Sequence, residues 1–500
     1  MIVDASRSDG DPRVRESVGF ASRVQGAAAE VIAARLGSGS PSHVLDTAWR
    51  SYWRIVDEKN PDAIALAEII ALQFREVLQH PSTSLKDACK YYTMLHDLYR
   101  LGASRNADIK RLDSNSIEPF GRWVKKHVER VELPLPKISG EARRVGYLCS
   151  WGMFTDGNPV ADIVHEAVNE HARRADREIF AYVTIAGTNE YVASLNGVSV
   201  RDIRQGYDFE RLAEAAAIIR NDRLDVLIAD GIGATATYLF QSRVAPVQIY
   251  YDFGCPFWSI DELDWAISTY DGGLTDVGLP LGRISKAWAI MLSGRRLRRV
   301  RELANDRLRA MLPANRVIIG AVTRLSKVSV EYARVLRAIL AENVGVHCVL
   351  AGPGESYALK ELEEDPELVG RVSVFRGFQE MADFARIIDV FVDTFPFSGG
   401  AAPMEVASFG VPIVSMVTHD RQRDYSEERD VRLVAQSERQ YIDLVTELST
   451  GGPLYMSATA EALSLAARFT DRARMIERTE EAISRASEYV YSARRNMRPS

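Results

Sequence analysis

The sequence predicts an α/β protein built from two Rossmann-like domains in tandem, preceded by an all-helical region. Three observations lead to this expectation. The chain has 500 residues, more than one hydrophobic core usually organises. Apolar residues recur at helical spacing in its N-terminal part. After that part, short β-branched or aromatic runs alternate with amphipathic segments in two successive series, which indicates two parallel sheets covered by helices on both faces.

The composition excludes several classes of protein. Hydrophobic residues make up 46% and charged residues 26% of the chain, as in an ordinary globular protein. The formal net charge is −6 with both signs interleaved, so no basic field exists to hold nucleic acid. No stretch reaches the roughly 18 unbroken apolar residues of a membrane span, and the N-terminus lacks the pattern of a signal peptide. We therefore expect a cytoplasmic protein without a nucleic acid partner or an integral membrane segment.

The cysteines and acidic residues give no sign of a metal site. The four cysteines lie far apart without a CxxC pair, so we expect reduced, mostly buried thiols; they are Cys89, Cys149, Cys255 and Cys348. Asp389 and Asp393 bracket a buried strand and do not form an aspartate motif in a loop. We expect neither a bound metal nor a resident cofactor.

Changes of composition divide the chain into four parts. Residues 1–140 are predicted to be helical and end in a linker rich in proline and charge. The first Rossmann-like domain is expected at 141–295, the second at 296–475, and a C-terminal amphipathic helix at 476–500. Two doubly wound domains in tandem predict a ligand cleft at the carboxyl ends of both sheets.

The most informative stretch is DVFVDTFPFSGGAAPMEVASFGVPIVSM at 389–416. It predicts a buried strand that ends at Thr394, a tight turn and a helix that starts near Gly400. Small residues at the turn would let backbone N–H groups approach a phosphate, where the helix dipole also favours negative charge; these residues are Ser398, Gly399, Gly400, Ala401 and Ala402. Glu405, one helical turn further on, could accept hydrogen bonds from ribose hydroxyls. A plain strand-to-helix turn followed by a surface glutamate is the alternative.

This stretch closely resembles the donor-binding segment of the O-GlcNAc transferase family and its bacterial relatives, which include adhesin-modifying N-glucosyltransferases. Three further segments resemble that family in the same order: 144–164, RVAPVQIYYDFGCPFWSIDELDWAIS at 243–268, and VTRLSKVS at 322–329. The resemblance covers about residues 141–475 and implies the GT-B fold, with an acceptor side in the first domain and a UDP-sugar donor side in the second.

The resemblance also implies roles for single residues. Lys327 corresponds to the family's lysine on the diphosphate of the UDP-sugar, and Arg324 lies beside it. The sequence departs from the family where Gly400, Ala401 and Ala402 replace His-Thr-Thr and where Glu405 replaces an aspartate, so the phosphates would be held by backbone amides and Lys327. A fixed cation at a departing diphosphate lowers the barrier to transfer.

The sequence indicates less clearly which residue would take the proton from the acceptor nucleophile. Asp156, in the loop after the first strand of the first domain, and Asp230, after a later strand, are the candidates. We expect an inverting, metal-independent glycosyltransferase that moves GlcNAc or glucose from a UDP-sugar to a protein or peptide. A glycan or small-molecule acceptor, a UDP-sugar epimerase and a catalytically weak UDP-sugar-binding protein are the alternatives. The helical region would serve acceptor recognition or self-association into a homo-oligomer.

Overall fold

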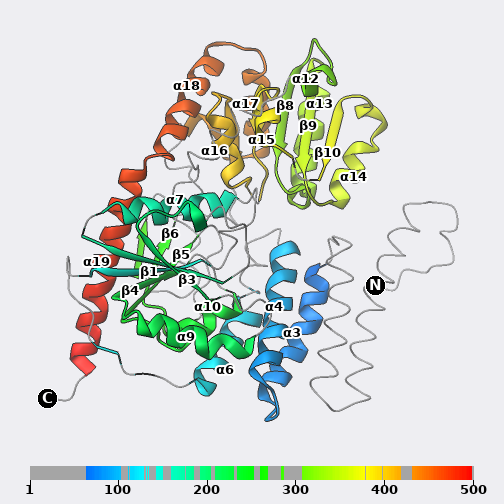
Figure 1. Ribbon diagram of the computed structural model, residues 1–500. Coiled ribbons are helices and arrows are strands. Elements are labelled where there is room, and N and C mark those ends of the chain that lie inside the picture. Colours follow the sequence, from blue (N-terminus) through cyan, green and yellow to red (C-terminus); the bar gives the residue numbers. More distant parts are fainter. Residues whose placement is uncertain are drawn as a thin grey trace, which may run out of the picture.

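The structure is a computed structural model of the whole chain. It describes residues 63–102, 111, 113–128, 131, 133–134, 142–149, 159–174, 176–184, 192–203, 209–229, 233–252, 260–268, 283–286, 307–377, 379–396, 398–417 and 431–497. These ranges contain two separate parallel sheets with helices around each (Figure 1).

The first sheet has seven strands in the order β3-β2-β1-β4-β5-β6-β7, and each strand is parallel to its neighbours. Its strands are β1 (Arg144–Cys149), β2 (Glu178–Val183), β3 (Val198–Asp202), β4 (Val226–Ala229), β5 (Val247–Asp252), β6 (Trp265–Ser268) and β7 (Ile284–Lys286). The helices around it are α7 (Pro159–Ala172), α9 (Leu212–Asn221) and α10 (Ala234–Gln241). The strand order reverses between β1 and β4, as in a doubly wound Rossmann fold.

The second sheet repeats this topology with six parallel strands in the order β10-β9-β8-β11-β12-β13. They are β8 (Val317–Val322), β9 (Val346–Gly352), β10 (Val372–Arg376), β11 (Val390–Val392), β12 (Ile413–Met416) and β13 (Val434–Ala435). The helices are α12 (Arg307–Ala310), α13 (Val330–Glu342), α14 (Tyr357–Glu363), α15 (Met381–Ala385), α16 (Ala401–Ala407), α17 (Glu438–Leu448) and α18 (Pro453–Arg468). The two Rossmann-like domains expected from the sequence are therefore confirmed.

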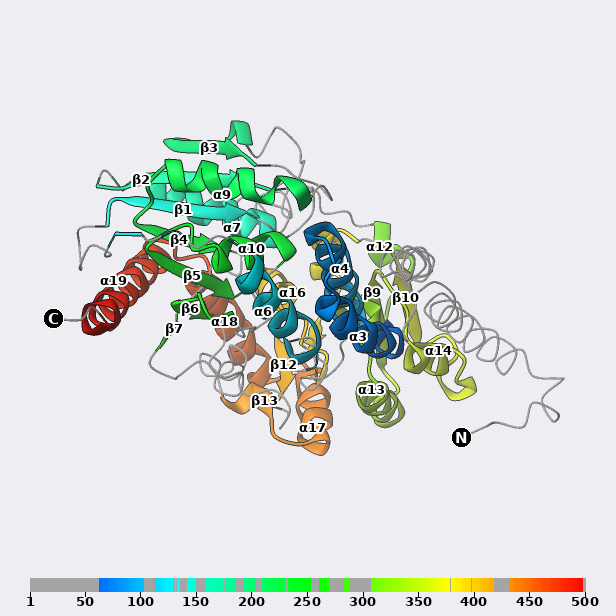
Figure 2. The ribbon, with the colours of Figure 1, turned by 90° about the horizontal axis from the view of Figure 1, so that it is seen from below.

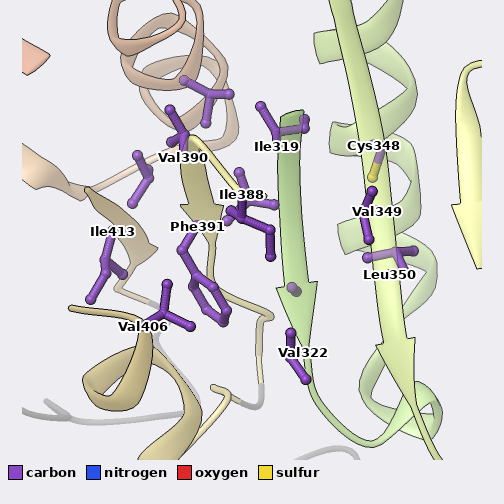
Figure 3. Close-up of a cluster of buried hydrophobic side chains, with 14 of the residues drawn as sticks. Ile319, Val322, Cys348, Val349, Leu350, Ile388, Val390, Phe391, Val406 and Ile413 are labelled. Atoms are coloured by element: carbon purple, nitrogen blue, oxygen red, sulfur yellow. The ribbon is translucent and has the colours of Figure 1, made fainter. Parts of the chain in front are cut away.

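A separate hydrophobic core supports the second domain. Strands β9 and β11 are buried on both faces, which explains their continuous apolar runs in the sequence. Figure 3 shows part of this core, where Ile319 and Val322 of β8 lie beside Phe391 of β11 and Val406 of α16. This packing fixes the start of α16 relative to the carboxyl ends of β8 and β11.

The described helices that precede the first sheet are α3 (Ala63–Gln79), α4 (Leu85–Gly102) and α6 (Glu118–His127). Figure 2 shows α6 against α10 and α4 close to them. Phe74, Tyr92 and Phe120 are fully buried in one cluster with Leu239 and Phe240 of α10. These helices thus share a core with the first Rossmann-like domain, so a deletion of residues 1–140 would strip that core as well as remove any acceptor surface.

The C-terminal helix α19 (Arg472–Met497) follows α18 and runs along the first domain (Figure 1). Its residues Ile483 and Val490 pack in the core of the first sheet, as its amphipathic sequence predicted. Its Glu480 accepts hydrogen bonds from Nε2 of His171 at 2.6 Å and from Arg177 at 2.9 and 2.7 Å. Although burial raises the pKa of the Glu480 carboxyl, the bonds from His171 and Arg177 lower it to about 2.

Candidate functional site

The reversal of strand order in the second sheet lies between β8 and β11. Loops that leave the carboxyl ends of two such strands diverge to opposite faces of the sheet and leave a crevice where ligands of doubly wound proteins bind. The loop after β8 carries Arg324 and Lys327, and the loop after β11 carries Gly399 and Gly400. The structure therefore brings together two segments that are about 70 residues apart in the sequence.

The loop after β8 is pressed against the loop after β9. Leu325 is fully buried and its N–H donates to the carbonyl oxygen of Pro353 at 2.8 Å. A Cβ atom on Gly352 would lie 1.8 Å from the carbonyl oxygen of Thr323, so only glycine fits there. This contact fixes the short 3-10 helix Leu325–Lys327 from which the Lys327 side chain extends.

Lys327 joins the two loops of the crevice. Its Nζ donates to the carbonyl oxygen of Ser398 at 2.6 Å, and the side chain is half-buried. Next to it, the Ser329 hydroxyl caps α13 by accepting from Tyr332 N at 3.0 Å and donates to the carbonyl oxygen of Phe395 at 2.9 Å. Arg324 is exposed at the start of the same 3-10 helix. The positive charge of Lys327 thus lies directly beside the turn that contains Gly399 and Gly400 (the glycine turn).

The turn itself is organised by Asp393, which follows β11 and is 2% exposed. Its Oδ1 accepts from the Gly399 N–H at 2.6 Å, and its backbone carbonyl accepts from the Tyr441 hydroxyl at 2.9 Å. Tyr332 donates its hydroxyl to the carbonyl oxygen of Val392 at 2.7 Å. Sequence reasoning placed Asp393 only as the end of a strand. The signal that could have found its role is an aspartate six residues before a Gly-Gly pair at a helix start.

Both glycines of the turn are required by its geometry. A Cβ on Gly399 would lie 2.9 Å from Cδ of Pro403 and 3.0 Å from Oδ1 of Asp393. Gly400 has φ of 68°, a left-handed conformation that side chains disfavour, and it immediately precedes α16. The predicted tight turn and the predicted helix start near Gly400 are therefore confirmed, although β11 ends at Val392, two residues earlier than the sequence pattern indicated.

The backbone amides of this turn divide into two groups. The Gly399 N–H donates to Asp393, and the Gly400 N–H points to the Ser398 hydroxyl at 3.4 Å. Ala401 and Ala402 are the first two residues of α16, where N–H groups have no acceptor within the helix. Of the small residues singled out in the sequence, these two therefore present the amides that suit an anion, and Gly399 and Gly400 shape the turn.

Glu405 lies in α16 and is 1% exposed. The alternative of a surface glutamate is therefore wrong. Its neighbours along the helix, Met404 and Val406, are fully buried in the core of the second domain. A carboxylate at this depth is costly unless it is paired or hydrogen-bonded. The Glu405 carboxylate therefore lies in the interior of the domain, in the helix that follows the turn containing Gly399 and Gly400.

The two candidate bases of the first domain, Asp156 and Asp230, lie outside the described residues. Cys255 also lies outside them, whereas Cys89, Cys149 and Cys348 are buried free thiols, as expected. Burial raises the pKa of Cys348 to about 12, so it has no thiolate character. Among the described residues no group of histidine, cysteine and acidic side chains could hold a metal ion, and no helix is both long and apolar enough to cross a bilayer.

The segment RVAPVQ, which helped to carry the sequence resemblance, has a structural role. Arg243 is 5% exposed and donates to the carbonyl oxygens of Glu262 at 2.8 Å and Pro246 at 2.7 Å, and to Oδ2 of Asp264 at 2.7 Å. The Gln248 amide donates to the carbonyl oxygens of Phe240 and Glu262 at 2.9 and 2.8 Å. These bonds tie α10, β5 and the start of β6 together.

No protein-family model matches this sequence, and no curated protein matches it. Among solved structures, a lysine-to-methionine mutant of the O-GlcNAc transferase of Thermobaculum terrenum is similar over 95% of this chain and 99% of its own, with 17% identity and a TM-score of 0.55. HepE of Anabaena, in complex with UDP and glucose, is similar over 68% of this chain and 99% of its own, with 13% identity and a TM-score of 0.47. A glycosyltransferase from Rickettsia africae is similar over 71% and 100%, with 11% identity and a TM-score of 0.45. The first of these similarities and the topology of both sheets show that the chain has the GT-B fold.

Proposed function

We propose that this protein is an inverting, metal-independent glycosyltransferase that binds a UDP-sugar in its second domain and transfers GlcNAc or glucose to a protein or peptide. The observation that carries the proposal is the contact of Lys327 with the Ser398 carbonyl, which puts a cation at the glycine turn where the second sheet reverses its strand order. The full-length similarity to a protein named as an O-GlcNAc transferase supports it.

The chemistry assigned to the crevice follows from its charges. A UDP leaving group gains negative charge as the glycosidic bond breaks, and a fixed cation binds that charge more tightly in the transition state than in the ground state. Lys327 would supply this cation, with Arg324 beside it. The amides of Ala401 and Ala402 would bind the diphosphate at the positive end of α16. In this proposal Lys327 and the two amides neutralise the diphosphate in place of a metal ion.

The buried Glu405 would accept hydrogen bonds from the two ribose hydroxyls of UDP. Glu405 lies in α16, next to the turn that contains Gly399 and Gly400, and a carboxylate accepts hydrogen bonds from neutral hydroxyl donors. Asp156 and Asp230 remain the proposed bases that would remove the proton of the acceptor nucleophile. The helical region would recognise the acceptor or join two copies of the chain.

The test is release of UDP by the full-length protein from a panel of UDP-sugars, with and without a cell lysate as the source of acceptors. The proposal predicts UDP release from UDP-GlcNAc or UDP-glucose that depends on the lysate, with labelled sugar in the protein fraction. Label in glycans or small molecules would move the acceptor to those classes. Conversion of the donor without any acceptor would indicate an epimerase, and UDP binding without turnover would indicate a binding protein.

A further inference from the structure

A cluster of basic side chains lies at the amino-terminal ends of the strands of the second sheet, opposite the crevice. Its members are Arg309 of α12, Arg316 just before β8, His347 of β9 and Arg371 just before β10. Because Ile318 pairs with His347 in register, Arg316, two residues earlier, is on the same face of the sheet as His347. Figure 1 shows α12 at the end of the second domain that is turned away from the first.

The arginines of this cluster differ in what they bind. Arg371 donates to the carbonyl oxygens of Leu340 at 2.6 Å and Val346 at 3.0 Å, near the end of α13. Arg309 reaches the carbonyl oxygens of Ala314 and Arg316 only at 3.4 Å. The Nη1 atoms of Arg309 and Arg316 and the Nε atom of Arg371 are buried and have no hydrogen-bond partner in the described part of the chain. Among the residues that the structure describes, each of the three guanidinium groups thus has one buried nitrogen without an acceptor.

The positive charges of the cluster act on one another, as two lowered pKa values indicate. Burial lowers the pKa of His347, and the charges of Arg316, Arg371 and Arg309 lower it further. Burial and the charge of Arg316 also lower the pKa of Arg371. Within the described ranges no carboxylate pairs with any of these four side chains. Each buried donor without an acceptor costs about 1–3 kcal/mol, so a group that supplied acceptors and negative charge would stabilise the fold.

We propose that Arg309, Arg316 and Arg371 form a binding site for a phosphate group, either free phosphate or the phosphate of a small ester, separate from the UDP-sugar site. A tetrahedral oxyanion presents several acceptor atoms in different directions and can bind guanidinium groups that come from three segments of the chain. A single carboxylate has one plane of acceptors and fits this arrangement less well. The site does not depend on the proposed function, since it uses none of the residues assigned to donor binding.

The test is a titration of the full-length protein with inorganic phosphate by calorimetry, at an ionic strength held constant with chloride. Phosphate could also enter the UDP-sugar crevice, so the titration is repeated with Lys327→Ala. The proposal predicts that wild type and Lys327→Ala bind phosphate equally, and that Arg316→Ala binds it about tenfold more weakly, the loss of one charge-assisted hydrogen bond. Arg334→Ala is the matched control, because Arg334 is an exposed arginine of the same domain with its own partner, Glu438.

Equal phosphate binding by Arg316→Ala and wild type would overturn the proposal, and so would no binding at all. Binding that is lost in Lys327→Ala but kept in Arg316→Ala would place phosphate in the donor crevice and also overturn it. A thermal melt adds a readout that does not need binding heat: Arg316→Glu should raise the melting temperature without phosphate and abolish its response to phosphate. Titration with glycerol 3-phosphate separates the two ligand sources, since tighter binding than inorganic phosphate indicates an ester.

Discussion

Arg243 in the first domain and Lys327 in the second are both basic residues from segments that resemble the O-GlcNAc transferase family. Their burial and their contacts differ. Arg243 is 5% exposed, and its guanidinium binds Pro246, Glu262 and Asp264. Lys327 is half-buried at a loop edge and contacts the carbonyl oxygen of Ser398. Membership in a resembling segment therefore does not assign a role by itself. Arg243 is buried with a carboxylate partner, and the role proposed for Lys327 rests on its half-buried position beside Ser398.

The largest effect is expected at Arg243. Replacing it with glutamine leaves the buried Asp264 carboxylate without its cation, and breaking a buried pair in this way costs about 3–5 kcal/mol of unfolding free energy. Urea denaturation followed by circular dichroism measures the loss. A variant as stable as wild type would mean that Arg243 does not stabilise the fold, and the difference drawn between Arg243 and Lys327 would then be wrong.

A second structural prediction concerns pH and Glu480, which fastens α19 to the first domain. Its pKa in the folded protein is lowered from the ordinary 4.5 to about 2. The ionised form therefore adds stability above about pH 4.5, and this contribution is lost as the pH falls towards 2, in total about 3 kcal/mol. Stability measured from pH 6 to pH 2.5 should fall more steeply for wild type than for Glu480→Gln. Parallel curves for the two proteins would contradict the assignment.

Lys327→Ala should act on catalysis and leave the fold intact. Turnover of the UDP-sugar should fall by about 10²-fold or more, the scale of one preorganised charge contact, which is about 2.7 kcal/mol. Its unfolding free energy should change by less than about 1.5 kcal/mol, the contribution of one hydrogen bond. Lys360→Ala, which removes a half-buried lysine from α14, is the matched control. Near-normal turnover in Lys327→Ala would remove Lys327 from the mechanism.

The smallest effect in this series is on binding alone. Glu405→Ala should weaken the affinity for UDP by roughly 1.5–3 kcal/mol, as expected for hydrogen bonds to a charged group. Titration calorimetry with UDP measures it directly. UDP has hydroxyls on its ribose, whereas 2′,3′-dideoxy-UDP lacks them, so the variant and wild type should bind the dideoxy compound with similar affinity. Unchanged UDP affinity in Glu405→Ala would show that this buried carboxylate has another role.

Much of the fold could be predicted from the sequence because its signals are local. The two series of buried strands and the tight turn before α16 are visible in stretches such as 389–416, where apolar runs and Gly-Gly follow each other directly. The crevice depends on contacts between distant segments and was predicted less completely. The family resemblance predicted a role for Lys327. The hydrogen bond from the Gly399 N–H to Asp393 could be recognised only once β11 and α16 were placed in space.

Burial of polar groups was the hardest property to predict. A surface position was the alternative for Glu405, and the residue is 1% exposed because Met404 and Val406 on both sides of it pack into the core. The helices α3, α4 and α6 were expected to form a region of their own, and their aromatic residues instead complete the core of the first domain. In both cases the outcome depends on which distant element covers the residue.

The proposed function requires that the second domain binds the UDP part of the donor where its sheet reverses strand order. A crystal structure of the protein with UDP would show where the nucleotide lies. We expect the diphosphate within hydrogen-bond distance of Lys327 Nζ and of the Ala401 and Ala402 amides, with the ribose hydroxyls on Glu405. UDP bound in the first domain, or a diphosphate out of reach of Lys327, would contradict it.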